Sequence, residues 1–237
     1  NPLGIILGST QVVLDRQRPW EMREKAASFI MDEVMRLDTT LKAFLDFARP
    51  ATPVLVEANV AEVFEETLSA IEERYRQEGY TIRRDFARRL PLMEADPGQL
   101  RQILMNILLN AFTAMPDGGE VVITIRSEKE PEMKKSATSK NDKRFISTRN
   151  PFTVPRDWLI ITIADNGCGM TTEQLNKIFD PFISFRSDGI GLGLSIVSQL
   201  VKLHRGYMEI DSREDVGTTF TLFFPCILKK TAAREAV

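Results

Sequence analysis

Three short stretches of this chain combine residue types that suit nucleotide chemistry. Asn106 and Asn110 lie four residues apart, the loop Asp165-Asn166-Gly167-Cys168-Gly169 follows, and Gly189-Ile190-Gly191-Leu192-Gly193-Leu194 comes next along the chain. A carboxylate can read a base, glycine-rich loops expose backbone N–H groups to phosphate, and an amide oxygen can hold a metal ion. Each glycine pattern alone recurs by chance, so the combination carries the prediction of a nucleotide pocket.

Asp165 directly follows the apolar stretch 159–164, so we expect it at the end of a buried strand. A carboxylate there accepts a hydrogen bond from the exocyclic amino group of adenine, where guanine carries an acceptor. Such a contact selects adenine, because the wrong base leaves a buried carboxylate unpaired. Gly167 and Gly169 would let the backbone pass close to the base. An ordinary Asp-x-Gly turn is the alternative.

Asn106 and Asn110 lie on one face of a helix expected over 97–115, where both interrupt an apolar run. Asparagine inside a helix lowers its stability, which argues against a purely local role. The second glycine run, with Gly189, Gly191, Gly193 and Leu194, opens a helix expected over 190–203. Free N–H groups and the helix dipole make that end an anion site for the phosphates.

The sequence predicts an α+β protein with two parts. An apolar seam with alternating steps of three and four residues indicates a long helix, which pairs with a short helix before a turn near Pro19; its members are Ala27, Ile30, Val34, Leu37, Leu41, Phe44 and Ala48. Two helices cannot bury both sides of such a seam, so we expect a homodimeric four-helix bundle. A hairpin that packs on its own domain is the alternative.

The second part should be a two-layer α/β sandwich, with one sheet covered by helices on one face. We expect strands at 54–58, 80–86, 92–95, 120–126, 158–164, 207–212 and 218–224, and helices at 60–76, 97–115 and 190–203. The polar stretch 127–157 has no clear period and is interpreted as an insertion that forms an exposed hairpin or loop. The expected organisation is therefore a hairpin at 1–50, a nucleotide-binding domain at 51–227 and a tail at 228–237.

Bulk properties exclude several classes of protein. A formal net charge of −2 argues against a nucleic-acid binder, and no apolar run is long enough to span a bilayer. Two scattered cysteines, Cys168 and Cys226, indicate a reducing compartment. The single histidine, His204, is assigned to a helix cap or the surface. The chain opens at Asn1 without a methionine, so we expect a fragment of a longer protein.

The order and spacing of these motifs resemble the ATP-binding domain of bacterial sensor histidine kinases, in the superfamily shared with gyrase, heat-shock chaperones and MutL proteins. The resemblance is strong from about residue 96 to 224. Asn1-Pro2-Leu3 also resembles the end of the family's pattern His-Glu-x-Arg-Asn-Pro-Leu, which places the phosphorylated histidine four positions before Asn1 and outside this chain. The spacing is closest to kinases of the nitrogen-regulation type.

The resemblance implies a role for each residue of the pocket. Asn110 would be the Mg²⁺ ligand, and Asn106 would support the phosphate and water network during catalysis. Phe182 would pack the lid between the glycine motifs. Arg186 would meet the γ-phosphate, with a solvated surface arginine as the alternative, and Thr218 would lie near the adenine through a water. Ile190 departs from the threonine or serine that the family commonly has there.

The implied function is that of a cytoplasmic kinase core that binds ATP and Mg²⁺. It would transfer the γ-phosphate to a histidine of the hairpin and then to an aspartate of a response regulator receiver domain. We expect this chain to bind ATP without autophosphorylation, and any membrane attachment to lie outside it. The alternatives are a clamp-type ATPase of the same superfamily, disfavoured by Asn106 where that class has a glutamate, and a kinase-inactive scaffold for docking or phosphatase activity.

Overall fold

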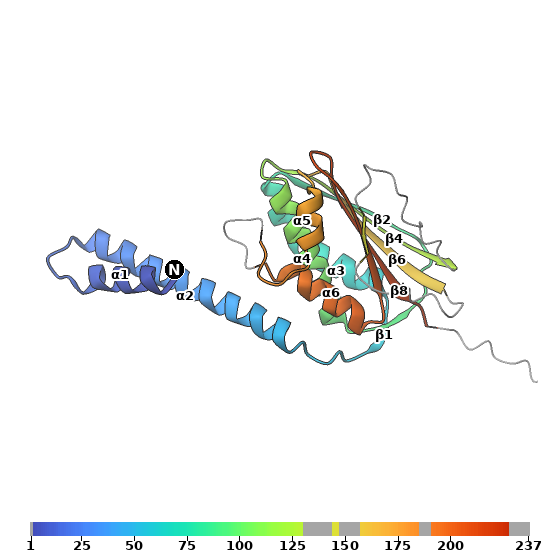
Figure 1. Ribbon diagram of the computed structural model, residues 1–237, viewed down its shortest axis with the longest axis horizontal. Helices are drawn as coiled ribbons and strands as arrows, with labels where there is room; N and C mark the ends of the chain where they lie inside the picture. Colours follow the sequence, from blue (N-terminus) through green and yellow to red (C-terminus); the bar gives the residue numbers. More distant parts are fainter. Residues whose placement is uncertain (1, 130–143, 147–156, 185–190, 228–237) are drawn as a thin grey trace, which may run out of the picture. The chain divides into compact units, whose positions relative to one another are not determined.

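The computed structural model describes residues 2–129, 144–146, 157–184 and 191–227. Contacts between Cα atoms divide the chain into two units, Asn1–Pro50 and Ala51–Val237. Figure 1 shows a helical hairpin in the first unit and a sheet with its covering helices in the second. Among the described residues, no helix is both long enough and apolar enough to cross a membrane.

The first unit is a hairpin of α1, Pro2–Leu14, and α2, Trp20–Ala48. The turn between them is held by Asp15, whose carboxylate accepts hydrogen bonds from the Gln17 N–H at 3.0 Å and from Arg18 Nε at 3.2 Å. Arg23 Nε donates to the Val13 carbonyl at 2.8 Å and ties the two helices together. The expected hairpin, with its turn beside Pro19, is confirmed.

The apolar seam of α2 packs against α1 only in part, as expected of a seam that two helices cannot bury alone. Ile30 and Leu37 are half-buried, but Val34 and Leu41 are 47% and 56% exposed. Ala27, Phe44 and Ala48 are exposed as well, although Phe44 makes other contacts. The physical reason is length, because α1 has 13 residues and α2 has 29, so one short neighbour cannot cover the whole seam.

The second unit is an α/β sandwich, and the expected strands and helices are confirmed with small shifts at their ends. Its elements are β1 Val56–Ala58, α3 Val60–Gln77, β2 Tyr80–Phe86, β3 Met93–Ala95, α4 Pro97–Ala114, β4 Gly119–Lys129, β5 Arg144–Ile146, β6 Asp157–Asp165, α5 Thr172–Lys177, α6 Gly193–Leu203, β7 Tyr207–Arg213 and β8 Gly217–Pro225. β1 pairs with β3, and the large sheet has the order β2-β4-β6-β8-β7-β5. Only β2 and β4 run parallel among the described pairs of this sheet.

Two elements were not expected from the sequence. α5 begins with a capping box, in which Thr171 accepts from the Gln174 N–H and the Gln174 side chain bonds back to the Thr171 N–H. β5 lies within the stretch interpreted as an insertion, whose ends are also strand, because β4 extends to Lys129 and β6 begins at Asp157. The rest of that stretch, residues 130–143 and 147–156, is outside the described residues.

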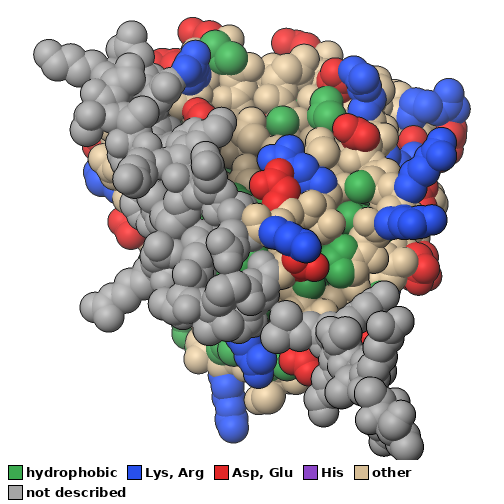
Figure 2. Space-filling view, turned by 90° about the vertical axis from the view of Figure 1, so that its right-hand side faces the viewer, with side chains coloured by type: hydrophobic (Ala, Val, Ile, Leu, Met, Phe, Trp, Pro, Cys, Tyr) green, Lys and Arg blue, Asp and Glu red, His purple; other side chains and the backbone are tan. Residues whose placement is uncertain are grey.

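Both faces of the sheet bury apolar side chains. One face packs against α3, α4 and α6, with fully buried residues such as Ile125, Ile161 and Leu222 in register across three strands (Figure 1). The neighbouring positions on the other face include the buried cluster Trp158, Ile160, Tyr207 and Phe223. Figure 2 looks at the side away from the helices, where the described lysines and arginines are interspersed with acidic side chains.

Helix α4 is fixed at both ends. At its start Asp96 Oδ1 accepts from the N–H groups of Gly98 at 2.9 Å and Gln99 at 3.2 Å. At its end Phe112 stacks on Tyr75 with ring centres 4.1 Å apart, and the Tyr80 hydroxyl donates to the Phe112 carbonyl at 3.0 Å. α4 is thus a fixed support for Asn106 and Asn110.

His204 joins α4 to α6 and is not a surface residue, which corrects the expectation. It is 2% exposed, its Nδ1 lies 2.8 Å from the Leu200 carbonyl, and its Nε2 lies 3.0 Å from the Asp96 N–H. A carbonyl only accepts and an N–H only donates, so Nδ1 carries the proton and the ring is neutral. The histidine does cap the last turn of α6, as expected, but it does so inside the domain.

Candidate nucleotide-binding site

Asp165 is the last residue of β6, and one of its carboxylate oxygens accepts hydrogen bonds from two backbone N–H groups. Its Oδ1 accepts from the Gly167 N–H at 2.9 Å and from the Thr218 N–H at 3.2 Å. Burial raises the pKa of Asp165 above the ordinary 3.8, although these two donors lower it. The carboxylate is therefore desolvated, and Oδ2 makes no hydrogen bond to another described residue. A ligand that donates a hydrogen bond fits this oxygen.

The loop after Asp165 is pressed between two other segments. A Cβ on Gly167 would lie 2.7 Å from the Ala114 Cβ, and the Cys168 N–H donates to the Ala114 carbonyl at 3.0 Å. On the other side the Asp215 N–H donates to the Cys168 carbonyl at 2.8 Å. Gly169 has a φ of +63°, and a Cβ there would overlap the Arg213 carbonyl. The glycines expected beside the base are thus required by packing of protein backbone.

Thr218 is the second residue of β8, the strand next to Asp165, and is 5% exposed. The two residues are direct partners in the register of β6 and β8. Besides its backbone bond to the carboxylate, Thr218 places its hydroxyl 2.9 Å from the hydroxyl of Ser212. The sheet register therefore brings the expected adenine residues together, although they are far apart in the sequence.

The start of α6 faces Asn106. Leu192 is the N-cap residue of α6, and its side chain accepts no hydrogen bond. The N–H groups of the first turn, including those of Gly193 and Leu194, therefore have no acceptor from the cap residue. A Cβ on Gly193 would lie 3.6 Å from Asn106 Oδ1, so the amide lies against the first turn of α6. Asn106 Nδ2 is buried and has no hydrogen-bond partner among the residues that the structure describes. An unpaired amide beside a helix N-terminus fits a phosphate oxygen.

Asn110 is half-buried one turn further along the same face of α4 and has a partner in the structure. Its amide suits Mg²⁺, which takes oxygen ligands and keeps several waters and phosphate oxygens. The described residues hold no group of three or more His, Cys, Asp or Glu that would form a metal site of protein ligands alone. A magnesium ion shared with phosphates is the arrangement that this donor set permits.

Arg186 and Gly189 lie outside the described residues. The described residues on either side of them, Phe182 and Gly191, are hydrogen-bonded to each other. The Phe182 N–H donates to the Gly191 carbonyl at 3.1 Å. Gly191 has a φ of +73°, and a Cβ there would lie 2.6 Å from the Ile183 carbonyl. Phe182 is 59% exposed, and the packing of the lid by its ring stays a prediction. Its backbone, with a φ of 65°, makes the hydrogen bond to Gly191.

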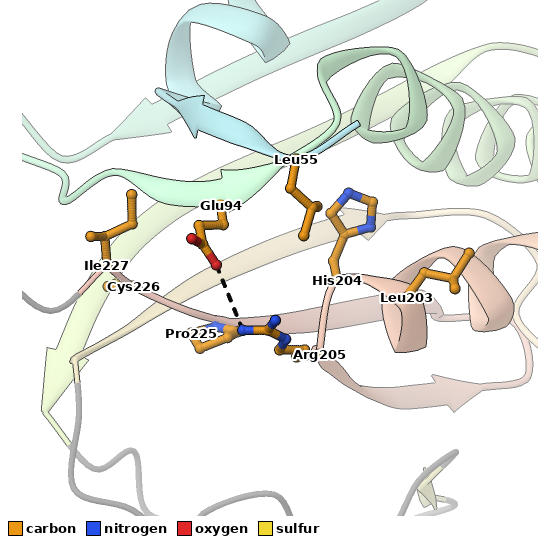
Figure 3. A pocket seen from close by; sticks show the side chains of 8 residues that line it. All are labelled: Leu55, Glu94, Leu203, His204, Arg205, Pro225, Cys226 and Ile227. Carbon is orange, nitrogen blue, oxygen red and sulfur yellow. Dashed lines mark ion pairs between the residues drawn. The ribbon is translucent and has the colours of Figure 1, made fainter. Parts of the chain in front are cut away.

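A cavity of about 180 Å³ lies at the other end of α6 (Figure 3). It is lined by Leu55, Glu94, Leu203, His204, Arg205, Pro225, Cys226 and Ile227, with a 3.6 Å ion pair between Arg205 and Glu94. The 11 residues of α6 separate it from the Gly193 end by about 16 Å. Burial, and next the charge of Asp157, raise the pKa of the Cys226 thiol to about 12, so this cysteine is no nucleophile.

Sequence reasoning missed two residues that shape the site. Asn166 Oδ1 accepts from the Glu120 N–H at 2.9 Å and holds the loop to the start of β4. Ser212, 1% exposed, bonds the hydroxyl of Thr218. Asn is common in turns because its side chain bonds nearby backbone, which was a usable signal for Asn166. For Ser212 no local signal exists, since its partner is set by strand register.

Comparison with known proteins gives a family and a fold. Residues 95–227 match the family described as histidine kinase-, DNA gyrase B-, and HSP90-like ATPase. The chain is 27% identical over 230 residues to sensor histidine kinase ZraS of Salmonella typhi, covering 97% of this chain and 44% of that protein. It is 26% identical over 196 residues to sporulation kinase E of Bacillus subtilis, covering 83% and 23%. The chain thus spans less than half the length of these curated relatives.

Solved structures share the fold. Histidine kinase ThkA in complex with response regulator protein TrrA aligns with a TM-score of 0.68 at 24% identity, covering 96% of this chain and 58% of that one. Full-length ShkA in complex with AMPPNP aligns with a TM-score of 0.64 at 22% identity, covering 95% and 44%. The predicted resemblance to sensor histidine kinases is confirmed, and so is the fold class of hairpin and sandwich.

Gly191 and Gly193, both in the second glycine run, differ in whether a side chain can be added, so alanine variants at these two positions form a matched pair. Gly191→Ala puts a side chain at positive φ and against a carbonyl, whereas Gly193→Ala adds a methyl group at ordinary contact distance inside a helix. We expect amide hydrogen exchange at Phe182 to become about tenfold faster in Gly191→Ala. It should be unchanged in Gly193→Ala. Equal exchange in both variants would contradict this account of the contact between Phe182 and Gly191.

Proposed function

The chain belongs to the histidine kinase-, DNA gyrase B-, and HSP90-like ATPase family, and from that premise we propose that it is the ATP-binding kinase core of a sensor histidine kinase. One observation carries the proposal. Three unsatisfied features stand on neighbouring elements: the open oxygen of Asp165, the uncapped start of α6 and the orphaned amide of Asn106. A nucleotide supplies a partner to each: its base donates a hydrogen bond to the carboxylate, and its phosphate oxygens accept from the helix start and the amide.

Adenine is the base that fits Asp165. Its amino group donates to Oδ2, while Oδ1 stays occupied by Gly167 and Thr218. The phosphates lie at the N–H groups of Gly191, Gly193 and Leu194, where Asn106 Nδ2 finds an acceptor. Asn110 holds Mg²⁺, which neutralises phosphate charge when bound. Gly189 and Arg186 extend this contact to the terminal phosphates.

The phosphoryl group goes to a histidine outside the 237 residues. His204, the single histidine of this sequence, is buried with both ring nitrogens hydrogen-bonded, so it cannot attack a phosphate. By the family pattern that Asn1-Pro2-Leu3 resembles, the acceptor lies four positions before Asn1, on the first helix of the hairpin. The phosphoryl group then passes to an aspartate of a response regulator receiver domain. Asn106, which has no carboxylate to activate water, favours transfer over hydrolysis.

The hairpin forms a homodimer, and the kinase core works in the cytoplasm, where its nucleotide is found. Val34 and Leu41 leave apolar surface on α2 that α1 does not cover. A second hairpin is the partner that matches such a seam, because heptad faces pack on each other. Histidine kinase ThkA, which shares the fold, is found with a response regulator, and the same class of partner is proposed for this chain.

Nucleotide binding tests the centre of the proposal. Asp165→Asn keeps the shape of the side chain but turns a donor toward the adenine amino group. We expect the affinity for ATP with Mg²⁺ to fall about a hundredfold by calorimetry, and GTP to bind neither protein.

The same variant has a matched stability control. A raised pKa in the folded state means that ionising Asp165 above pH 3.8 costs stability, so removing the charge should leave the unliganded melting temperature equal or higher at neutral pH. Weak binding in a variant that melts early would instead indicate damage to the fold. ATP binding that survives in Asp165→Asn would refute adenine reading by this residue.

Phosphoryl transfer has its own test. Incubation of this chain with ATP labelled in the γ-phosphate should leave no acid-labile, base-stable label on it. His204→Gln is the control, because label that persists in this variant is not on histidine. Label that appears on the chain and vanishes in His204→Gln would overturn the assignment of the acceptor to another part of the protein.

Oligomeric state tests the seam. Light scattering should give the mass of two chains for the natural sequence, and 26.9 kDa for the double variant Val34→Glu, Leu41→Glu. Thr39→Glu adds a similar charge at an exposed position of α2 and should stay dimeric. A natural chain that is monomeric at micromolar concentration would contradict the dimer.

A further inference from the structure

The chain leaves the sheet directly after Asp165, and Asn166 is the first residue of the loop that follows. β6 ends at Asp165, and so do its pairings with β4 and β8. One step further in the same registers, Asn166 falls opposite Glu120 of β4 on one side and Gly217 of β8 on the other. The backbone of Asn166 is therefore released from both neighbouring strands at the point where the site begins.

The side chain of Asn166 replaces the ladder contact that its backbone gives up. Its Oδ1 accepts a hydrogen bond from the Glu120 N–H at 2.9 Å. If the ladder continued, a backbone carbonyl would be the acceptor at this place. A backbone N–H only donates, so the oxygen of the amide, and not its nitrogen, faces Glu120. The backbone of Asn166 can thus turn away without leaving that N–H unpaired.

The turn made by this released backbone holds one oxygen of the Asp165 carboxylate. The Gly167 N–H donates to Asp165 Oδ1 at 2.9 Å, which is an Asx-turn with Asn166 as its middle residue. The second donor to Oδ1, the Thr218 N–H at 3.2 Å, comes from the sheet. Both oxygens belong to one planar group, so two donors on Oδ1 restrict where Oδ2 points. The position of Gly167 therefore affects the oxygen that a base would use.

The loop has one anchor in each half. In the first half, Asn166 lies between two glycines: a Cβ on Gly119 would be 2.7 Å from its Oδ1, and a Cβ on Gly217 would be 3.1 Å from its Cα. In the second half, the backbone of Cys168 bonds to the end of α4 and to the turn between β7 and β8. Of these two anchors only the first is a side chain, so a substitution can remove it and leave the other in place.

We propose that Asn166 is a positioning residue for nucleotide binding, which fixes the turn at Gly167 and so orients the open oxygen of Asp165 toward the adenine amino group. The inference rests on the proposed function, because it assumes that Asp165 reads the base. Asn166 touches no nucleotide in this scheme. It acts through the hydrogen bond from Gly167 to Asp165, and its own partner is the backbone of β4.

Asn166→Ala removes the acceptor of the Glu120 N–H and tests the role in the unliganded chain. The protection of the Gly167 amide against hydrogen exchange should fall about fivefold, as expected for the loss of one hydrogen bond between neutral groups. The Cys168 N–H, which donates to the Ala114 carbonyl at 3.0 Å, should keep its protection in the same variant. Carboxyl NMR should show the pKa of Asp165 rising further, because the charged form is less firmly bonded.

The same variant should lose affinity for ATP with Mg²⁺ by about fivefold in calorimetry. A merely structural anchor would lower the melting temperature and leave the pKa of Asp165 unchanged. Unchanged protection of Gly167 in Asn166→Ala would overturn the proposal.

Two further variants complete the test. Asn166→Asp keeps an oxygen acceptor of the same reach, so it should retain the protection of Gly167. Glu120→Gln keeps the backbone N–H and changes only a side chain whose 3.6 Å ion pair with Arg83 is exposed, so protection and affinity should not change. A loss of protection in Asn166→Ala that is equally large in Asn166→Asp would contradict a role for the side-chain oxygen.

Failure of this role is distinguishable from failure of the proposed function. Full sensitivity of ATP binding to Asp165→Asn, with no effect of Asn166→Ala on protection or affinity, would retain the function and reject the role of Asn166. ATP binding that tolerates Asp165→Asn would overturn the function and this role together. Lower affinity in Asn166→Ala with unchanged protection of Gly167 would indicate a direct contact with the nucleotide and would also reject the positioning role.

Discussion

The nucleotide site depends on the cost of burying the Asp165 carboxylate at the end of β6. Burial raises its pKa, and no ion pair offsets that cost among the described residues; two backbone N–H groups do so in part. One donor comes from the loop that follows and the other from the neighbouring strand β8. The carboxylate can therefore be held only if the loop closes back and the register of β6 and β8 is right. The same loop and strand geometry that allows the carboxylate to be buried also leaves its other oxygen ready to bind a ligand.

The same logic extends to the helices that cover the sheet. α4 and α6 run in opposite directions, since Asp96 and His204 meet at one end while Asn106 and Gly193 meet nearer the other. The first end is closed by a neutral histidine that satisfies groups on both helices. The second end keeps an orphaned amide and an uncapped helix start. Polar groups left unsatisfied in a native structure cost stability, and at this end the groups left unsatisfied are ones that a polyphosphate could bind.

Much of the fold was predictable because its signals are local. The Asp96-Pro97 start of α4, the seam of α2 and the apolar run of β6 each predicted an element that the structure contains. α5 was missed although Thr171 and Gln174 carry its capping box, because the helix has only six residues. The site was predictable as a set of residue types. Its connections were not, since the pairing of Thr218 with both Asp165 and Ser212 follows from sheet register.

His204 shows why composition alone misplaces a residue. Next to a helix end, a histidine is reasonably assigned to a cap, and it is one. The sequence gives no sign that its other nitrogen accepts from Asp96, over a hundred positions away. Burial in this case excludes a chemical role, because both nitrogens are occupied, whereas burial of Asp165 creates one, because an oxygen stays open. The difference between a structural and a functional polar group in this domain is thus the number of hydrogen bonds that the fold leaves for a ligand to make.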